Sequence, residues 1–297
     1  MRNLIKKYYY CYLLEYIRNS KFPPKKEQMQ SFGSLFISNL AFANNFNTAI
    51  SEDVASGVSN TPLEALAKSM SEYVERIAFR NGKNNGNSLC QTNRSEGFAA
   101  YPYLSFNKNK ALARVREISL CESIERYSWP YFWSNKSVNF ELQDCKKSTI
   151  DEISKLTGIE DIQHIFPSLT CEQILCISIA KIGNHGAIVG ACCSKEKNTA
   201  IRGSIHELIK HYIGFKKIDT ELDIKSDYIN RLYHLSKVGF SLYQERLSFR
   251  GKESIILPHL ELDGLVNHPF DQSFLVYRTR FKGQPDFISD SPNLGYM

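Results

Sequence analysis

The sequence predicts an α+β protein, because long helical patterns alternate with short strand-like segments. Two apolar patterns with a helical period cover residues 61–79 and 107–129. Three further segments, 173–183, 253–264 and 273–283, are rich in β-branched and aromatic residues and are followed or closed by Gly. We therefore expect long helices packed on mixed β-sheets.

The composition is that of a folded protein with a sizeable core. The chain has 297 residues, of which 42% are apolar and 23% charged, enough for one large domain or two modest ones. The formal net charge is +6, but the basic residues are scattered in short clusters such as Lys6-Lys7 and Lys25-Lys26. This charge favours an anionic partner. It is accompanied by neither a helix-turn-helix signature nor a ribonucleoprotein-type strand, so we expect no nucleic-acid partner.

The cysteine pattern predicts reduced thiols in a cytoplasmic protein. Eight cysteines show no Cys-x-x-Cys pair, and Cys192 and Cys193 lack further metal ligands at recognisable spacing, so they are expected in the core. Glu15 and Arg18 interrupt the N-terminal segment, which therefore does not resemble a signal peptide. No stretch approaches eighteen uncharged apolar residues, so we expect no transmembrane helix and no membrane partner.

The first long helix is expected to begin after a turn that contains Gly and Asn. Thr61 is a candidate N-cap and Pro62 takes the first helical position. Glu72 and Glu75 project about 60° apart, on the side opposite the apolar stripe, so both carboxylates can reach one point. The stripe consists of Leu63, Leu66, Met70, Val74 and Ile77.

The second helix is unusual because it is apolar on more than one side. Val115 and Ile118 fall close to the directions taken by Glu122 and Glu125. A carboxylate among apolar neighbours is costly unless it is paired or coordinates a cation. The opposite stripe holds Ala113, Leu120 and Ile124.

A third segment, residues 183–212, combines a turn, a strand and a helix. Glu207 points away from the apolar face of this helix. A shorter capped helix is expected at 148–162, with Ser148 or Thr149 at its start and Gly158 near its end. The apolar face of the third-segment helix comprises Ile201, Ile205, Leu208, Ile209 and Tyr212.

The motif Glu-x-x-Glu-Arg occurs twice, at residues 72–76 and 122–126. A single copy is usually a solvated helix face with ion pairs that contribute about 0.2 to 0.5 kcal/mol each. Two copies, each after a Gly-containing turn and an Ala-rich helix, favour a functional role for the motif over a solvated helix face. Magnesium usually takes one or two protein carboxylates together with nucleotide phosphates, and the planar guanidinium of Arg76 or Arg126 suits phosphate oxygens.

Common nucleotide-binding and hydrolase motifs are missing. The sequence contains neither Gly-x-x-x-x-Gly-Lys-Ser/Thr nor Gly-x-Gly-x-x-Gly, which argues against P-loop and Rossmann architectures. Gly-x-Ser-x-Gly and His-Glu-x-x-His are absent as well. The sequence therefore favours a magnesium–nucleotide site whose architecture is neither of the P-loop nor of the Rossmann type.

Three segments together resemble the signatures of the YcaO family, whose members activate backbone amides with ATP. SGVSNTPLEALAKSMSEYVERIAF is similar to the first signature, and SEGFAAYPYLSFNKNKALARVREISLCESIERYSW to the second. GNHGAIVGACCSKEKNTAIRGSIHELIKHY is similar to the third. The resemblance covers residues from about 56 to 212. Each of the first two segments is a turn followed by an Ala-rich helix that ends in two glutamates, and the third is a turn, a strand and a helix with one Glu.

The resemblance implies an ATP and magnesium site between pseudo-symmetric halves. Four carboxylates would bind the magnesium ions that hold ATP: Glu72, Glu75, Glu122 and Glu125. Six residues would lie at or near the nucleotide: Ser56, Ser59, Arg76, Arg126, Arg202 and Glu207.

The resemblance also implies an activity. Family enzymes phosphorylate the oxygen of a peptide backbone amide, and the loss of phosphate then yields an azoline, a thioamide or an amidine. The nucleophile belongs to the substrate, so we assign no catalytic residue. The implied partners are a ribosomally made peptide or protein substrate and a subunit that delivers it, and a homodimer is one possible assembly.

The resemblance divides the chain at residue 50. Residues 1–50 are expected to form an accessory helix and linker, since SKFPPKKEQ contains a Pro pair that breaks regular structure. Residues 51–297 would form the ATP-binding catalytic domain. Two alternatives stay open: a degenerate YcaO-like scaffold or peptide-binding subunit without turnover, and an unrelated soluble α+β binding protein whose glutamates decorate its surface.

Overall fold

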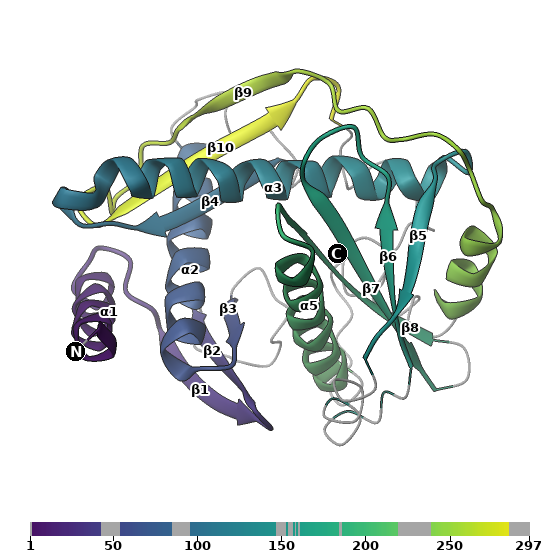
Figure 1. Ribbon diagram of the computed structural model, residues 1–297. Coiled ribbons are helices and arrows are strands. Elements are labelled where there is room, and N and C mark those ends of the chain that lie inside the picture. The colour runs from purple at the N-terminus through teal and green to yellow at the C-terminus, as the bar shows by residue number, and fades with distance from the viewer. Residues whose placement is uncertain are drawn as a thin grey trace. The chain divides into compact units, whose positions relative to one another are not determined.

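The computed structural model describes residues 2–42, 54–84, 96–146, 153, 157, 159, 161–183, 186–218 and 239–284. They belong to two compact units, which are described separately. Unit 1 comprises Met1–Thr92, Phe98–Ser119 and Asp263–Thr279, and unit 2 comprises Asn93–Gly97, Leu120–Leu262 and Arg280–Met297. Helices and sheets occur in both, which confirms the predicted α+β class (Figure 1).

Unit 1 begins with a helix and a three-stranded antiparallel sheet. Helix α1 (Arg2–Arg18) precedes strands β1 (Lys26–Phe32), β2 (Leu35–Ala41) and β3 (Val54–Ser59), which lie in the order β1-β2-β3. Helix α2 (Pro62–Asn84) follows and packs on β2 and β3 (Figure 1).

A second three-stranded sheet combines segments that are far apart in the sequence. Strands β4 (Gly97–Pro102), β10 (Phe274–Phe281) and β9 (Leu260–Leu265) lie in the order β4-β10-β9. A short 3-10 helix, η2 (Ser105–Asn107), leads from β4 into the longest helix, α3 (Lys108–Ser134).

Helix α3 has two apolar sides because it serves two hydrophobic cores. Val115 packs with Leu275 and Tyr277 in unit 1. Farther along, Leu120 and Ile124 pack in the core of unit 2, on the opposite side of the helix. The apolar side therefore changes near the point where the chain passes from one unit to the other, which explains the two stripes in the sequence.

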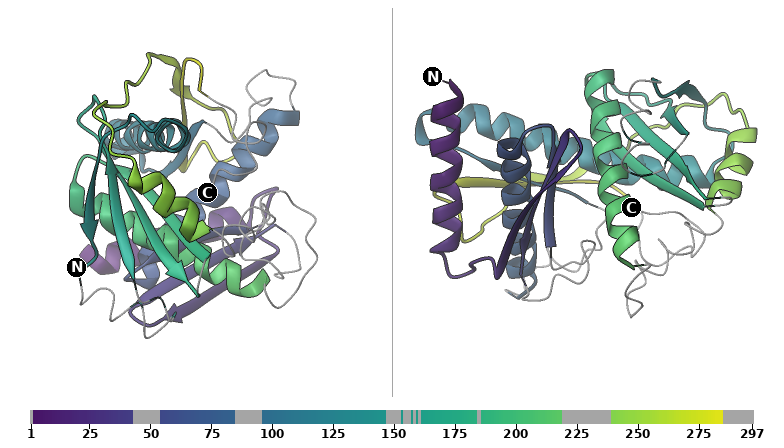
Figure 2. Two further views of the ribbon diagram at one scale, coloured as in Figure 1. Left: turned by 90° about the vertical axis from the view of Figure 1, so that its right-hand side faces the viewer. Right: turned by 90° about the horizontal axis from the view of Figure 1, so that it is seen from below.

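Unit 2 is a four-stranded antiparallel sheet with a helix on one face. Strands β5 (Phe140–Asp144), β6 (Ile162–Pro167), β7 (Ile174–Ile182) and β8 (Gly186–Ser194) lie in sequence order. Helix α5 (Lys197–Ile218) packs on β7 and β8 (Figures 1 and 2).

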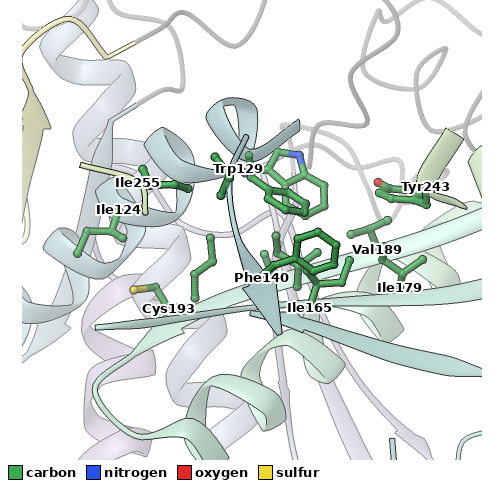
Figure 3. Close-up of a cluster of buried hydrophobic side chains, with 14 of the residues drawn as sticks. Ile124, Trp129, Phe140, Ile165, Ile179, Val189, Cys193, Tyr243 and Ile255 are labelled. Atoms are coloured by element: carbon green, nitrogen blue, oxygen red, sulfur yellow. The ribbon is translucent and has the colours of Figure 1, made fainter. Parts of the chain in front are cut away.

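The other face of this sheet carries the larger apolar core. Figure 3 shows Trp129 of α3 and Tyr243 among the sheet residues Ile165, Ile179 and Val189. Tyr243 belongs to a helical segment at 239–248. Because successive strand residues point to opposite faces, Val189 faces this core and the next residue faces α5.

The two units repeat one contact between a hairpin and the helix that follows it. In unit 1, a Cβ atom on Gly57 would lie 2.1 Å from the carbonyl oxygen of Ala65. In unit 2, a Cβ atom on Gly190 would lie 2.2 Å from the carbonyl oxygen of Ser204. Both glycines pair across the hairpin with a buried serine, Ser38 in unit 1 and Ser178 in unit 2. The halves therefore share one local design.

Several predicted elements are confirmed. Helix α2 begins at Pro62, and Thr61 caps it, since the backbone N–H of Glu64 donates to Thr61 Oγ1 at 3.3 Å. The predicted strands at 173–183 and 273–283 are β7 and β10. The third segment forms β8 and α5, whose predicted apolar face is buried or partly buried.

Other predicted elements differ from the structure. The expected turn that holds Ser56 and Ser59 is instead the buried strand β3, because Gly57 lets α2 approach a strand at this point. Of the predicted strand at 253–264, only residues 260–264 lie in a strand, β9 (Leu260–Leu265). The helix expected at 148–162 lies mostly outside the described residues.

The N-terminal segment is more than a helix and a linker. The expected helix is α1, but residues 26–41 form two strands that pair with β3. Unit 1 includes all of residues 1–92, so the predicted division at residue 50 falls within it. In the part of the chain that the structure describes, no helix is long and apolar enough to cross a membrane, and the cysteines are free.

We expect Gly190→Ala to destabilise the protein, because its new Cβ atom would meet backbone atoms of α5 that cannot move aside alone. Overpacking of this kind costs about 1 to 3 kcal/mol. Gly264→Ala is the matched control, since a Cβ atom there would have no heavy atom within 4 Å. Thermal unfolding should show a melting temperature lowered by several degrees for Gly190→Ala only. Equal melting temperatures for the two variants would contradict the close helix–strand contact.

Candidate functional site

The two Glu-x-x-Glu-Arg motifs lie in different units. Residues 72–76 lie in α2 of unit 1, and residues 122–126 lie in α3, in the part that belongs to unit 2. All six charged side chains are half-buried. Each motif is therefore described within its own unit.

In unit 1, Glu72 is held from two sides. Arg76 Nη2 donates to Glu72 Oε1 at 2.6 Å, and the backbone N–H of Ser56 donates to Glu72 Oε2 at 3.0 Å. An ionised carboxylate is favoured by an adjacent guanidinium and by N–H donors. These contacts fix one carboxylate at the surface between α2 and β3. Glu75 lies one turn farther along the same helix.

Asn39 supports this arrangement, and sequence reasoning missed it. The hydroxyl of Ser56 donates to Asn39 Oδ1 at 2.6 Å, and both residues are buried. Asn39 lies opposite Ser56 in the pairing of β2 with β3. The chain Asn39–Ser56–Glu72–Arg76 is thus a continuous polar set. Its first member went unnoticed because residues 1–50 were expected to be a helix and linker.

The start of α2 carries a second polar group. The hydroxyl of Ser59 donates to Glu64 Oε2 at 2.9 Å. Lys68 Nζ donates to the carbonyl oxygen of Val58 at 2.7 Å, which places an ammonium group beside β3. Ser56 and Ser59, two predicted nucleotide contacts, therefore both lie on β3 and both bind a glutamate of α2, Glu72 and Glu64 respectively.

The unit 2 motif repeats the ion pair of unit 1. Arg126 Nη2 contacts Glu122 Oε1, one helical turn away, as Arg76 contacts Glu72. Glu125 differs, because burial and then the charge of Glu122 raise its pKa from 4.5 to about 8. Arg126 opposes this shift but does not overcome it. Burial and the neighbouring carboxylate therefore favour the protonated form of Glu125 when no cation is bound.

The third segment contributes one of its two predicted residues to this cluster. The charge of Glu207 on α5 also raises the pKa of Glu125, so α5 and α3 present carboxyl groups to a common region within unit 2. Lys210 Nζ lies 3.4 Å from Glu207 Oε2. Arg202 is exposed and makes no hydrogen bond or ion pair with the described residues. The structure therefore brings Glu207, but not Arg202, to the carboxyl cluster.

Thiols border the same cluster. The side chains of Cys121 and Cys193 hydrogen-bond, and this contact together with burial raises the pKa of Cys193. Burial, followed by the charges of Glu125 and Glu207, raises the pKa of Cys192. Because thiolates rather than thiols are nucleophilic, these groups are unsuited to nucleophilic catalysis. Cys193 is buried, as predicted, whereas Cys192 is half-buried rather than in the core.

The carboxyl groups suit magnesium bound together with a nucleotide. No three His, Cys, Asp or Glu side chains among the described residues form a ready-made metal site. Magnesium usually takes only one or two protein carboxylates and completes its octahedron with waters and phosphates. Burial, followed by the charge of Glu122, raises the pKa of Glu125, and a cation bound beside this carboxyl group would oppose both effects. A hard cation fits this donor set.

Comparisons with known proteins identify the fold. No protein-family model matches the sequence, and no curated protein matches it either. Among solved structures, the chain is similar to one in the E. coli microcin synthetase McbBCD complex with pro-MccB17 bound. The TM-score is 0.60, with 14% sequence identity, over 86% of this chain and 86% of that chain.

Two further structures extend the likeness. YcaO from Methanopyrus kandleri, bound with AMPPCP and Mg2+, matches 97% of this chain and 94% of its own, with a TM-score of 0.59 and 8% identity. A heterocyclase in complex with substrate and cofactor matches 89% of this chain and 50% of its own, with a TM-score of 0.50 and 12% identity. The resemblance seen in the sequence is thus confirmed in the architecture: this chain has a YcaO-like fold.

Proposed function

We propose that this protein binds ATP and magnesium at its two Glu-x-x-Glu-Arg motifs and uses them to activate a backbone amide of a peptide. The observation that carries the proposal is the repeated geometry of the motifs. In each, the Arg binds the first Glu one turn earlier, and the second Glu lies beside them on the same half-buried surface. An ion pair on a helix surface requires only one carboxylate, so the second, half-buried carboxylate of each motif supports a further role in binding.

The glutamates and the arginines of the motifs would bind different parts of the magnesium–ATP complex. Glu72 and Glu122, each paired with its arginine, and Glu75 and Glu125 would provide oxygen ligands for magnesium. Arg76 and Arg126 would orient phosphate oxygens, because a planar guanidinium can bind a carboxylate and a phosphate oxygen together. Ser56 and Ser59 are buried in β3, so they would act on nucleotide binding indirectly, by holding Glu72 and Glu64 in place, and Lys68 adds positive charge there.

Bound ATP would supply a phosphoryl group that turns the amide oxygen into a good leaving group. Phosphoryl transfer asks a protein mainly for positioning and charge stabilisation, which the half-buried carboxylates and arginines can provide. The protonated Glu125 would release its proton when a cation binds beside it. The attacking nucleophile would come from the peptide, which agrees with the raised pKa values of Cys192 and Cys193.

The similar structures support a peptide substrate and partner subunits. One is a synthetase complex with pro-MccB17 bound, and another is a heterocyclase in complex with substrate. We propose that this chain likewise acts on a ribosomally made peptide or protein, in the cytoplasm, with a second subunit that delivers it. The product would be an azoline, a thioamide or an amidine.

A non-catalytic YcaO-like subunit is the second candidate, and the placement of Arg202 favours it. This predicted nucleotide-binding side chain is exposed and bound to none of the described residues, so one expected part of the site is not assembled. Such a subunit would bind peptide or nucleotide without turnover. Magnesium-dependent ATP consumption in the presence of a modified peptide separates the two candidates.

Magnesium and ATP together should stabilise the protein, by about 2.7 kcal/mol at a hundredfold excess over the dissociation constant. Glu122→Gln should weaken this binding at least tenfold, because it keeps the side-chain volume but removes the charge that magnesium requires. The apo variant should stay folded. Calorimetric titration and thermal unfolding measure both effects.

Glu117→Gln is the matched control for that experiment, since Glu117 lies on the same helix and pairs with Arg114 on the exposed surface. It should alter stability by only about 0.2 to 0.5 kcal/mol and leave nucleotide binding unchanged. If the Glu122 and Glu117 variants bind magnesium and ATP equally well, the metal role of the second motif is wrong.

The raised pKa of Glu125 predicts a pH-dependent effect on the apo protein. Between its ordinary pKa of 4.5 and about 8, this carboxyl ionises in the unfolded state but stays protonated in the folded state. The free energy of unfolding of the wild type should therefore fall, relative to that of Glu125→Gln, as pH rises through this window. Above pH 8 the difference should level off. Denaturant unfolding at several pH values measures it, and a difference that is constant from pH 5 to 8 would contradict the burial of Glu125.

A further inference from the structure

Several thiols gather in unit 2, next to the second Glu-x-x-Glu-Arg motif. Cys193 belongs to the main apolar core, and Cys121 and Cys171 pack against that core. Cys192 precedes Cys193 on β8, and Cys121 immediately precedes Glu122, the first glutamate of the motif. Among the described cysteines, no two are joined by a disulfide. A covalent change at these thiols would therefore act directly beside the carboxyl groups.

Two of these thiols form a pair. Cys121 lies one turn before Ile124 on α3, so the two side chains leave the helix in neighbouring directions. Figure 3 shows Cys193 of β8 below Ile124, and both belong to one apolar core. The side chains of Cys121 and Cys193 hydrogen-bond to each other. A short movement would therefore bring these two sulfur atoms to the separation of about 2 Å that a disulfide requires.

The other two thiols are directed elsewhere. Cys192 points to the opposite face of β8, because successive strand residues alternate. Its sulfur packs there against α5, since a Cβ atom on Gly203 would lie 2.3 Å from it. The thiol of Cys171 donates to the carbonyl oxygen of Gln173, in its own loop, at 4.0 Å. The hydrogen-bonded pair between α3 and β8 is therefore the one best placed to be joined.

We propose that Cys121 and Cys193 form a reversible disulfide when the protein meets a peroxide, and that this bond weakens the neighbouring nucleotide site. The effect on nucleotide binding rests on the proposed function, whereas the disulfide itself does not. Cys121 is half-buried and Cys193 is buried. Peroxide from solution should therefore reach Cys121 first, and Cys193 should react in the second step.

The reaction consumes one molecule of hydrogen peroxide for each disulfide. The sulfur of Cys121 attacks one peroxide oxygen and breaks the O–O bond, which gives a sulfenic acid, and the other oxygen leaves as water with the thiol proton. The sulfur of Cys193 then attacks the sulfenic sulfur, whose hydroxyl group leaves as a second water with the proton of Cys193. The two sulfurs lose two electrons, which reduce the peroxide. A dithiol reverses the step by thiol–disulfide exchange.

The environment of Cys193 should make this reaction slow. The hydrogen bond to Cys121, followed by burial, raises the pKa of Cys193, and the thiolate is the form that attacks. The sulfur of Cys121 is nevertheless in contact with it at all times, and such proximity favours a reaction within the chain over one with a thiol from solution. We expect the disulfide to form over minutes to hours rather than seconds.

The disulfide would act on the site by moving α3 relative to β8. The two sulfurs must approach from hydrogen-bond contact to about 2 Å. Glu122 is the next residue after Cys121, and Glu125 lies one turn farther along α3, so both carboxyl groups would move with Cys121. A displacement of about 1 Å is enough to weaken a site that depends on exact positions. The melting temperature should rise instead, because a cross-link restricts the unfolded chain.

The test treats the full chain with hydrogen peroxide, blocks the remaining thiols with iodoacetamide, and maps disulfides by mass spectrometry of a non-reduced digest. The wild type should yield the peptide pair that joins Cys121 to Cys193. The oxidised protein should melt several degrees higher and bind magnesium and ATP at least tenfold more weakly, and dithiothreitol should reverse both changes. Cys121→Ser and Cys121→Ala should show neither change. Cys11→Ser, at an exposed thiol on α1, is the matched control and should behave like the wild type.

The proposal would be overturned by the absence of the Cys121–Cys193 peptide pair, or by a main disulfide that joins other cysteines. An oxidised wild type that binds magnesium and ATP as tightly as the reduced protein would overturn the effect on the site, and so would an equal loss of affinity in Cys121→Ser. A reduced wild type that binds no magnesium and ATP would contradict the proposed function, while the peptide pair and the raised melting temperature would still confirm the disulfide. The two proposals can therefore fail independently.

Discussion

The close contact between a strand glycine and the following helix determines the geometry of both units. Gly57 brings α2 onto β3, and this places Glu72 within reach of the backbone N–H of Ser56. Gly190 brings α5 onto β8, on the side of the sheet opposite the main apolar core. A Cβ atom at either position would clash with backbone atoms of the helix, so a larger residue would require the helix to move. The positions of Glu72 in unit 1 and of Glu207 in unit 2 therefore depend on this contact.

The same design carries different chemistry in the two units. In unit 1, Glu72 of α2 accepts a hydrogen bond from the strand, while in unit 2 His211 of α5 meets the carbonyl oxygen of Val189 at 2.6 Å. The carboxyl groups of unit 2 instead come largely from α3, with Glu207 of α5 beside them. The repeat in the fold therefore does not produce two identical sites, because the carboxyl groups of the two units come from different elements.

The sequence predicted the helices better than the strands, for identifiable reasons. Thr61 and Pro62 mark the start of α2 because capping is a local property. The two apolar sides of α3 were visible, but their cause required the two cores, which depend on contacts distant in sequence. The β1-β2 hairpin was missed, although Gly33 and Ser34 between Phe32 and Leu35 are a two-residue turn of a common type, with Gly33 at a φ of 60°.

The candidate site was predictable where the motif itself carries it. The pairs Glu72–Arg76 and Glu122–Arg126 follow from spacing on a helix, since residues four apart are neighbours. Asn39 and Lys68 were not predictable in the same way, because their contacts depend on strand register and on the approach of α2 to β3. Arg202, by contrast, was predicted near the nucleotide but does not lie with Glu207. It comes five residues earlier in α5, so its side chain leaves the helix on another side, where it is exposed.

The central claim is that the Glu-x-x-Glu-Arg motifs bind magnesium and ATP. It is tested most directly by the calorimetric affinity of magnesium and ATP for Glu72→Gln, a change at the first Glu of the unit 1 motif. The account predicts an affinity for Glu72→Gln that is at least tenfold lower than that of the wild type. An affinity equal to that of the wild type would contradict the account.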